Sequence, residues 1–228
     1  MSTIGDRIKR YEKASDHKLL PRSPLFIRVD GKSFHTYTRH CERPFDQPLI
    51  NAMVIAAQKT AKEMSGFKAA YIQSDECTFM LSDYDTYQTQ GWFNYELSKV
   101  VSISASAFTA YFNEAYGHTV PAMFDSRAFT VPIEDAPNVF IWRQRDWERN
   151  SIQMLARAHF IHKECENKKV PELHEMLFTK GINWAKYNDQ LKNGTFLFAD
   201  LTPVHLKETY ETLLQALAPT TPQTEEKR

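Results

Sequence analysis

The chain has 228 residues, of which 42% are hydrophobic and 13% aromatic, which excludes an intrinsically disordered chain. Lys and Arg (28) balance Asp and Glu (28), so any nucleic-acid surface must be a local patch. The 3 cysteines stand far apart, which supports neither a disulfide framework nor a zinc ribbon, and no apolar run approaches the roughly 20 residues of a membrane span. We therefore expect a soluble, cytoplasmic protein with no membrane partner.

The first predicted elements are a helix and a buried strand. Ile4, Ile8 and Tyr11 fall on one face of a helix over residues 3–14. The apolar strand over residues 25–30 runs directly into an acidic side chain and a glycine turn. An unpaired charge at the mouth of a buried strand is unfavourable, so a cation is the natural partner of this carboxylate, Asp30.

The turn after this strand reads Asp30-Gly31-Lys32-Ser33-Phe34-His35, and it leads into a polar and aromatic loop. Gly31 would let the backbone approach a triphosphate closely, and Lys32, Ser33 and Phe34 would offer N–H donors to it. His35 could contact phosphate or ribose, although a single histidine is more often structural. A helix over residues 48–64 follows, opened by Pro48.

A strand–turn–strand unit over residues 67–82 carries Ser74, Asp75 and Glu76 at its tip. Two strands that each present a carboxylate at the same edge predict a two-metal site for nucleotide chemistry, held by Asp30 and Asp75. Glu76 is open to three interpretations: a third ligand, a general acid or base, or a solvated residue of the hairpin turn.

A helix over residues 94–115 and a strand over 122–131 complete this unit. Ser98 and Lys99, near the start of that helix, could face phosphates. After the first helix, the order of elements is βαββαβ. The predicted fold class is therefore α+β, a ferredoxin-like βαββαβ unit with a helical C-terminal extension.

The last third is predicted to be mainly helical. A long helix over residues 138–161 places five side chains on one polar face, which is either solvated or suited to phosphates and base edges: Arg143, Asp146, Asn150, Gln153 and Arg157. A short helix opened by Pro171, a further helix after Trp184 and a last helix over 204–217 follow. We expect a catalytic core over 1–135, a helical extension over 136–218 that packs on it, and a disordered tail over 219–228.

Together, these motifs resemble the tRNA-histidine guanylyltransferase family, over about residues 5–160. The resemblance rests on Asp30-Gly31-Lys32-Ser33-Phe34-His35, Arg43-Pro44-x-Asp46, Ser74-Asp75-Glu76, Ser98-Lys99 and Arg143-Gln144-x-Asp146. It implies a polymerase-type palm that extends RNA in the 3′→5′ direction, with ATP and GTP as substrates, tRNA as partner and a tetramer built from dimers.

The resemblance also implies roles for individual residues. Asp30, the Gly31 carbonyl and Asp75 would hold two Mg²⁺ ions. The residues that would bind the nucleotide are 30–35, Arg43, Asp46, Ser74, Asp75 and Lys99. The candidates that it implies for contacts to a second nucleotide or to the 5′ phosphates are Arg28, Arg43, Lys99 and Asn150. Arg143 and Arg157, on the polar helix face, are further candidates for RNA contacts.

One motif departs from the eukaryotic pattern. Eukaryotic members carry a His-Ile-Asn-Asn-Leu-Tyr-Asn type sequence where this chain has Trp147-Glu148-Arg149-Asn150-Ser151-Ile152-Gln153, so Glu148 stands at the histidine position. This pattern resembles the guanylyltransferase-like branch, which implies template-dependent repair of 5′-truncated tRNA. A carboxylate at position 148 would repel the RNA backbone. The alternative to template-dependent repair is untemplated guanylate addition to tRNA-His.

Two other functions remain in competition. A nucleotide cyclase would use the same palm and the same two carboxylates, but it would need base-reading residues on partner strands. A non-catalytic ferredoxin-like RNA-binding module would show aromatic residues on its open sheet face and would need no paired carboxylates. His159 and His162 have the i, i+3 spacing of zinc ligands, but we interpret them as ordinary surface or core residues because no third ligand is near.

Overall fold

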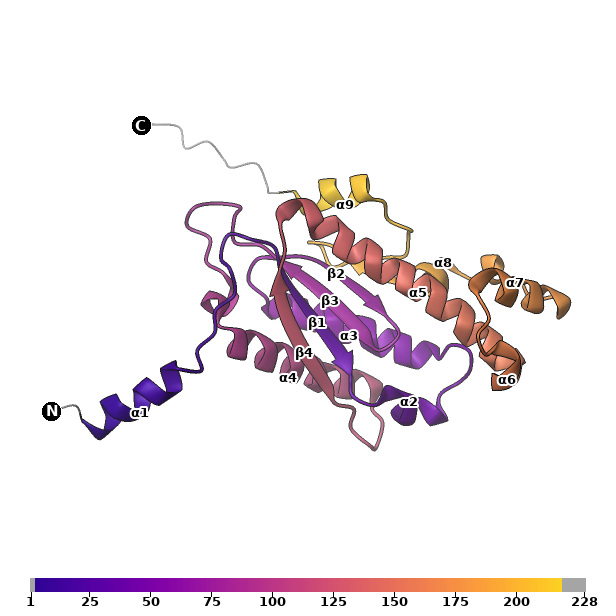
Figure 1. The fold of residues 1–228 in the computed structure, drawn as a ribbon, viewed down its shortest axis with the longest axis horizontal. Coiled ribbons are helices and arrows are strands. Elements are labelled where there is room, and N and C mark those ends of the chain that lie inside the picture. Colours follow the sequence, from indigo (N-terminus) through magenta and orange to yellow (C-terminus); the bar gives the residue numbers. More distant parts are fainter. Residues whose placement is uncertain (1–2, 219–228) are drawn as a thin grey trace.

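A computed structural model describes residues 3–218 of the chain. One antiparallel sheet of six strands forms its centre, in the order β4-β1-β3-β2-β5-β6 (Figure 1). The strands are β1 (Leu25–Gly31), β2 (Phe67–Gln73), β3 (Glu76–Leu81), β4 (Phe124–Thr130), β5 (Thr195–Leu197) and β6 (Pro203–Val204). The first four strands and the helices between them form the predicted ferredoxin-like α+β unit.

Helices cover both faces of the sheet. The longer ones are α1 (Ile4–Lys13), α3 (Gln47–Glu63), α4 (Leu97–Tyr116), α5 (Ala136–His159), α7 (Val170–Thr179) and α9 (Tyr210–Leu217). Shorter α-helices are α2 (Phe34–Tyr37), α6 (His162–Cys165) and α8 (Asp189–Asn193), and short 3₁₀ turns cover Thr38–His40, Trp92–Tyr95, Ile133–Asp135 and Trp184–Lys186. Within residues 3–218, no helix is both long and apolar enough to cross a membrane.

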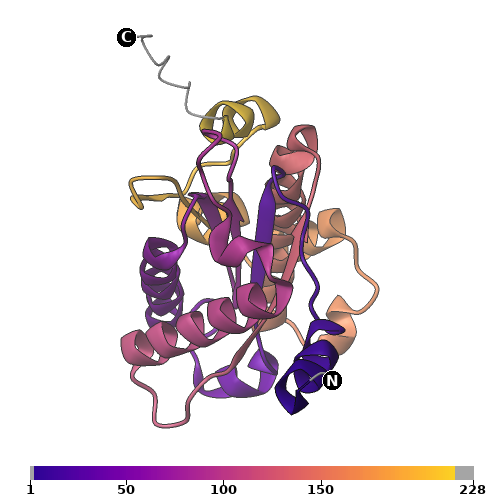
Figure 2. The same ribbon diagram turned by 90° about the vertical axis from the view of Figure 1, so that its left-hand side faces the viewer.

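The alternation of side chains along β1 assigns its two faces to two cores. Leu25, Ile27 and Val29 are buried beneath α3 and α4, whereas Phe26 belongs to a second core beneath α5 and α9. Figure 2 shows these two layers on opposite sides of the strands. Both faces of the sheet are therefore covered at the end where β1 begins.

Two predicted elements differ from the structure, and the last two strands were not predicted. The loop after His35 contains α2 and a 3₁₀ turn, because the buried Phe34 ring anchors it against Phe112 and Phe124. The last helix begins at Tyr210 and not at residue 204, since residues 203–204 pair with β5 and Thr209 caps the helix through the Thr212 amide. The tail over 219–228 lies outside the described residues.

Candidate active site

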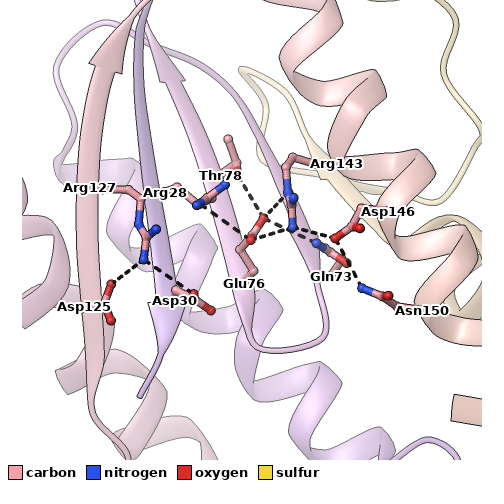
Figure 3. Close-up of polar contacts among 10 residues, drawn as sticks. All are labelled: Arg28, Asp30, Gln73, Glu76, Thr78, Asp125, Arg127, Arg143, Asp146 and Asn150. Atoms are coloured by element: carbon pink, nitrogen blue, oxygen red, sulfur yellow. Dashed lines mark hydrogen bonds and ion pairs between the residues drawn. The ribbon is translucent and has the colours of Figure 1, made fainter. Parts of the chain in front are cut away.

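The sheet face beneath α5 changes from apolar to polar along the strands. On β1, Phe26 is followed by Arg28 and Asp30, and on β3 the side chains opposite them are Met80, Thr78 and Glu76. The apolar end packs against α5 and α9. The polar end, where β1 stops and the β2–β3 hairpin turns, carries the candidate site (Figure 3).

The two predicted carboxylates lie next to each other at this end. Asp30 closes β1, and Asp75 lies in the β2–β3 turn, where Ser74 adopts a left-handed backbone with φ of 49°. A hydrogen bond of 3.0 Å from the Gly31 amide to the Asp75 carbonyl joins this turn to the end of β1. The structure thus brings Asp30 and Asp75 together, as the sequence indicated.

Their surroundings disfavour two negative charges. Burial raises the pKa of Asp75, a hydrogen bond with Ser74 lowers it, and the charges of Asp30 and Glu76 raise it further. Among the described residues, no cation lies within 4.0 Å of Asp75, and Asp30 has only Arg127 at 3.9 Å. A divalent cation between the two carboxylates would relieve this repulsion.

Glu76 occupies a different position from the two aspartates. It is buried, and both of its carboxylate oxygens accept hydrogen bonds from the Arg143 guanidinium of α5, at 2.6 and 2.7 Å (Figure 3). Arg28 lies 3.8 Å away, and Gln73 and Thr78 each donate to the same carboxylate at 3.4 Å. Glu76 is therefore not a solvated turn residue, and its oxygens are committed to the protein.

The polar face of α5 covers this end of the sheet, but its members behave differently. Arg143 is buried and binds both Glu76 and Asp146, and Asn150 donates to Asp146 at 3.3 Å. Gln153 and Arg157 have no side-chain partner among residues 3–218, and both border the cavity beside Asp75. Arg143 therefore has a structural role between α5 and the sheet. Gln153 and Arg157, at the C-terminal end of the polar face, are free to bind a ligand.

The turn after β1 is built differently from its predicted form. A Cβ on Gly31 would lie 2.2 Å from the Phe34 ring, so the packing of that ring by itself requires a glycine at this position. The Lys32 amide donates to the Met123 carbonyl at 2.8 Å, which leaves it unavailable to a phosphate. Ser33 and His35 border the adjoining cavity, as does Phe34, whose side chain points into the core.

Two clefts meet at Asp30 and Asp75. The large cleft, of about 600 Å³, lies between the turn after β1, the loop over residues 41–46 and the end of α5. The small cleft, of about 260 Å³, lies between the hairpin tip and α5. Both are bordered by Asp30, Ser74, Asp75, Met154 and Arg157.

The loop residues of the large cleft have separate roles. Arg43 borders the cleft and makes no ion pair or hydrogen bond with the described residues. Asp46 borders it too, but its two oxygens accept the backbone amides of Leu49 and Glu42, at 2.8 and 3.0 Å. Asp46 thus begins α3 and shapes the loop, so only Arg43 of this pair is free to bind a phosphate.

Lys99 is not brought to this site. It lies in the first turn of α4 and forms an exposed ion pair of 2.7 Å with Glu96. Glu96 bridges to Lys18, before the start of β1, whereas Asp30 is at the other end of that strand. Lys99 and its neighbour Ser98 therefore lie at the opposite end of the sheet from the carboxylates.

The structure adds residues that the sequence analysis did not select. Asp125 and Arg127 are two residues apart on β4 and lie on the same sheet face as Asp30. The Arg127 guanidinium is 3.4 Å from the Asp125 carboxylate (Figure 3). The i, i+2 spacing of Asp125 and Arg127 within the predicted strand could have indicated that their side chains share a face. Trp142 stacks on the Arg143 guanidinium, at 4.6 Å, and only the packing of α5 on the sheet reveals that contact.

The donor set fits magnesium better than a metal caged by protein. Within residues 3–218, no three His, Cys, Asp or Glu side chains converge on one point. Mg²⁺ is commonly bound by one or two carboxylates together with water and substrate phosphates, which is what Asp30 and Asp75 can provide. The buried Gln73 Oε1, which borders the small cleft and has no partner among the described residues, is a further free acceptor.

Comparison with known proteins shows the family of this chain. The sequence profile of the family described as tRNAHis guanylyltransferase matches residues 5–132. The tRNA(His) guanylyltransferase of Schizosaccharomyces pombe is 30% identical over 209 residues, which covers 82% of this chain and 77% of that protein.

Two solved bacterial structures are also similar to this chain, both of a tRNA(His) guanylyltransferase-like protein. The complex with ATP is 39% identical, with a TM-score of 0.89, and the match covers 94% of this chain and 99% of that chain. The complex with GTP is 37% identical, with a TM-score of 0.73, and covers 86% and 84%. The chain belongs to the tRNA(His) guanylyltransferase family and is a nucleotidyltransferase.

Proposed function

We propose that this chain adds nucleotides in the 3′→5′ direction to the 5′ end of tRNA and repairs 5′-truncated tRNA by copying the opposite strand. The observation that carries the proposal is the meeting of two clefts at Asp30 and Asp75. Two clefts that share a pair of carboxylates can bring two phosphate-bearing substrates together, which joining a nucleotide to an RNA end requires.

In this proposal the large cleft holds the incoming nucleotide. The Phe34 and His35 amides begin α2 and have no partner among the described residues, so they can donate to phosphate oxygens. Arg43, in the loop over residues 41–46 that borders the same cleft, adds a positive charge. ATP and GTP, the ligands of the two similar bacterial proteins, are the substrates we expect here.

Asp30, the Gly31 carbonyl and Asp75 would hold two Mg²⁺ ions. These ions would supply a lower pKa for the attacking 3′-hydroxyl and would neutralise phosphate charge. The chain's own contribution is to hold both carboxylates at the junction of the clefts, through the Gly31–Asp75 backbone hydrogen bond. We assign Glu76 the positioning of Arg143 and of the hairpin tip, because its oxygens are already bound.

The small cleft would hold the RNA end, with Asn150 and Arg157 at its α5 wall. Glu148 pairs with Lys207 at 2.8 Å and does not border either cleft, so the predicted repulsion of RNA by this carboxylate would act outside the two clefts. Contacts to phosphates carry little sequence information. Selection of each nucleotide would then come from pairing with the opposite strand of the acceptor stem.

The test is competition between 5′-truncated tRNAs that differ in anticodon, and between matched and mismatched template positions. We expect similar kcat/KM values across anticodons and at least a roughly tenfold preference for the matched nucleotide, about 1.4 kcal/mol. A strong preference for the histidine anticodon, or guanylate addition regardless of the opposing base, would instead establish the alternative. Untemplated guanylate addition is favoured by the relatives, which are named tRNA(His) guanylyltransferases.

The assembly and layout of the protein complete the proposal. A tetramer built from dimers is supported by α1, whose apolar side chains Ile4, Ile8 and Tyr11 are exposed. We propose the same division as before, into a catalytic core over residues 1–135 and a helical extension over residues 136–218. β5 pairs with β2, so we expect the two parts to unfold as one unit. The cytoplasmic location stays a prediction.

A further inference from the structure

A third cavity continues the small cleft along α5. It has a volume of about 270 Å³ and lies between the C-terminal end of α5 and the segment from α6 to the start of α7. Gln153 and Arg157 border both this α6 cavity and the small cleft, so the two spaces meet across one turn of α5. Figure 1 shows α6 and α7 beside that end of α5.

The polar side chains between the two spaces are not used by the fold. Arg143, Asp146 and Asn150 bind one another or Glu76. In contrast, Gln153, Arg157 and His162 have no side-chain partner in residues 3–218. An arginine that has no carboxylate partner and borders three connected cavities indicates a site for an anion.

The charges around the α6 cavity favour the same ligand. Arg157 and Lys168 are positive, His162 can become so, and Glu166 is the one acidic residue among the described residues of the wall. Lys168 pairs with Glu172 at 3.1 Å, but this ion pair is exposed and such pairs contribute little. Lys168 can therefore exchange this partner for a phosphate.

We propose that the α6 cavity is a phosphate subsite, which takes a backbone phosphate of the RNA strand whose end reacts at Asp30 and Asp75. The inference rests on the proposed function, because it assumes that the RNA end lies in the small cleft. The triphosphate of a second nucleotide has the same chemistry, so the experiment distinguishes the two sources. The subsite would hold the strand as it leaves the reaction centre.

The test compares the double variant His162→Ala/Lys168→Ala with Lys163→Ala, in the full chain. Lys163 also lies on α6, is exposed and does not border the cavity, so it controls for loss of a surface charge. We expect the double variant to raise the KM for 5′-truncated tRNA about tenfold and to leave the KM for ATP and GTP unchanged. Fluorescence anisotropy at several salt concentrations gives the slope of log K for tRNA binding against log salt concentration. The magnitude of this slope should decrease by about 1, which corresponds to the loss of one phosphate contact.

The other outcomes are equally definite. A raised KM for ATP or GTP with unchanged tRNA affinity would assign the subsite to a nucleotide triphosphate and overturn the RNA strand as its ligand. Unchanged values for both would overturn the subsite. Should the double variant fail to fold, Lys168→Gln tests the same charge. If the unaltered protein binds tRNA but adds no nucleotide, the proposed function fails, whereas the anisotropy measurement still decides the α6 cavity.

Discussion

The charge of Asp75 works against the stability of the metal-free protein. Burial raises the pKa of this carboxyl, and the neighbouring charges of Asp30 and Glu76 raise it further. The ionised form is thus less favourable in the folded chain than in the unfolded one. Residues that hold a reacting centre together often reduce stability in this way.

We therefore expect Asp75→Asn to abolish nucleotide addition and yet to stabilise the metal-free protein. Bridging two Mg²⁺ ions requires the carboxylate charge, so an amide cannot replace it. Removal of the buried charge should add about 1 kcal/mol, which corresponds to a rise in Tm of about 2–4 °C. Thermal unfolding in EDTA, at several pH values, measures the difference.

The pH dependence has a defined sign. Below the usual pKa of 3.8, the Asp75 side chain is protonated in both states and the variant gains nothing. As the pH rises through the raised pKa, the unaltered protein loses stability relative to Asp75→Asn. Added Mg²⁺ and ATP should raise the Tm of the unaltered protein only. Near-normal nucleotide addition by Asp75→Asn would contradict the two-metal assignment.

Glu76 and Arg143 make a second test at the scale of residues. Their side chains are 10% and 9% exposed, so removal of either partner takes one counterion from a buried charge, which keeps a second one: Arg28 at 3.8 Å from Glu76, or Asp146 at 3.1 Å from Arg143. Arg143→Met and Glu76→Gln should each reduce the free energy of unfolding by about 1.5–3 kcal/mol, the range for lost hydrogen bonds between charged groups. The double variant should lose clearly less than the sum of the two.

Urea unfolding of the four proteins measures this coupling, and kcat under folded conditions measures its effect on the reaction. If Glu76 positions Arg143 and the hairpin tip, stability and kcat fall together and the double variant recovers part of the stability. A loss of kcat in Glu76→Gln without any loss of stability would instead make Glu76 a general acid or base.

At the scale of elements, the end of the sheet at which a cation lies decides whether it can serve the site. Arg43→Ala removes a free charge from the large cleft, and we expect a ten- to hundredfold loss of kcat/KM for ATP or GTP, about 1.5–3 kcal/mol. Lys99→Ala removes an exposed partner of Glu96 at the other end of the sheet. Steady-state kinetics of both variants should show the loss only for Arg43→Ala.

Lys99→Ala is thus the matched control, since each variant removes one exposed cation. Both should keep the Tm of the unaltered protein within about 1 °C, because exposed charges contribute little to stability. An equal loss of kcat/KM in Lys99→Ala would mean that a second copy of the chain brings its α4 to this site, in which case the clefts of a single chain are incomplete.

At the scale of the whole molecule, α1 extends away from the sheet with none of its residues buried (Figure 1). Its side chains Ile4, Ile8 and Tyr11 are 73%, 47% and 68% exposed. An apolar stripe on a helix normally faces a protein surface. A second copy of the chain is the partner that the proposed tetramer would provide.

We expect Ile8→Gln to reduce the mass of the assembly, measured by light scattering over a dilution series, because it places a polar group in the apolar stripe. Lys9→Gln, one residue along the same helix and off the stripe, should leave the mass unchanged. The same reduced mass in both variants would show that the apolar stripe is not the specific contact, and a monomeric unaltered protein would remove the tetramer from the proposal.

Most of the catalytic unit could be predicted from the sequence, for local reasons. Alternating and continuous apolar runs define β1 to β4, apolar spacing defines α3, and the spacing of polar residues defines α5. Antiparallel neighbours place strand ends and turns at the same edge, so the meeting of Asp30 with the β2–β3 turn follows from the order of the strands. The two candidate carboxylates could therefore be predicted from the sequence alone.

Only the tertiary structure decided which charged residues are free. Arg143 lies 67 residues from Glu76 in sequence, so nothing local indicates that the two neutralise each other. The sequence showed five polar residues on one face of α5, and packing on the sheet divided them between the fold and the clefts. Lys99 has a local phosphate-binding pattern, but α4 begins at the far end of the sheet. Long-range packing sets these partners, because charge pairing depends on distance in space and not on order along the chain.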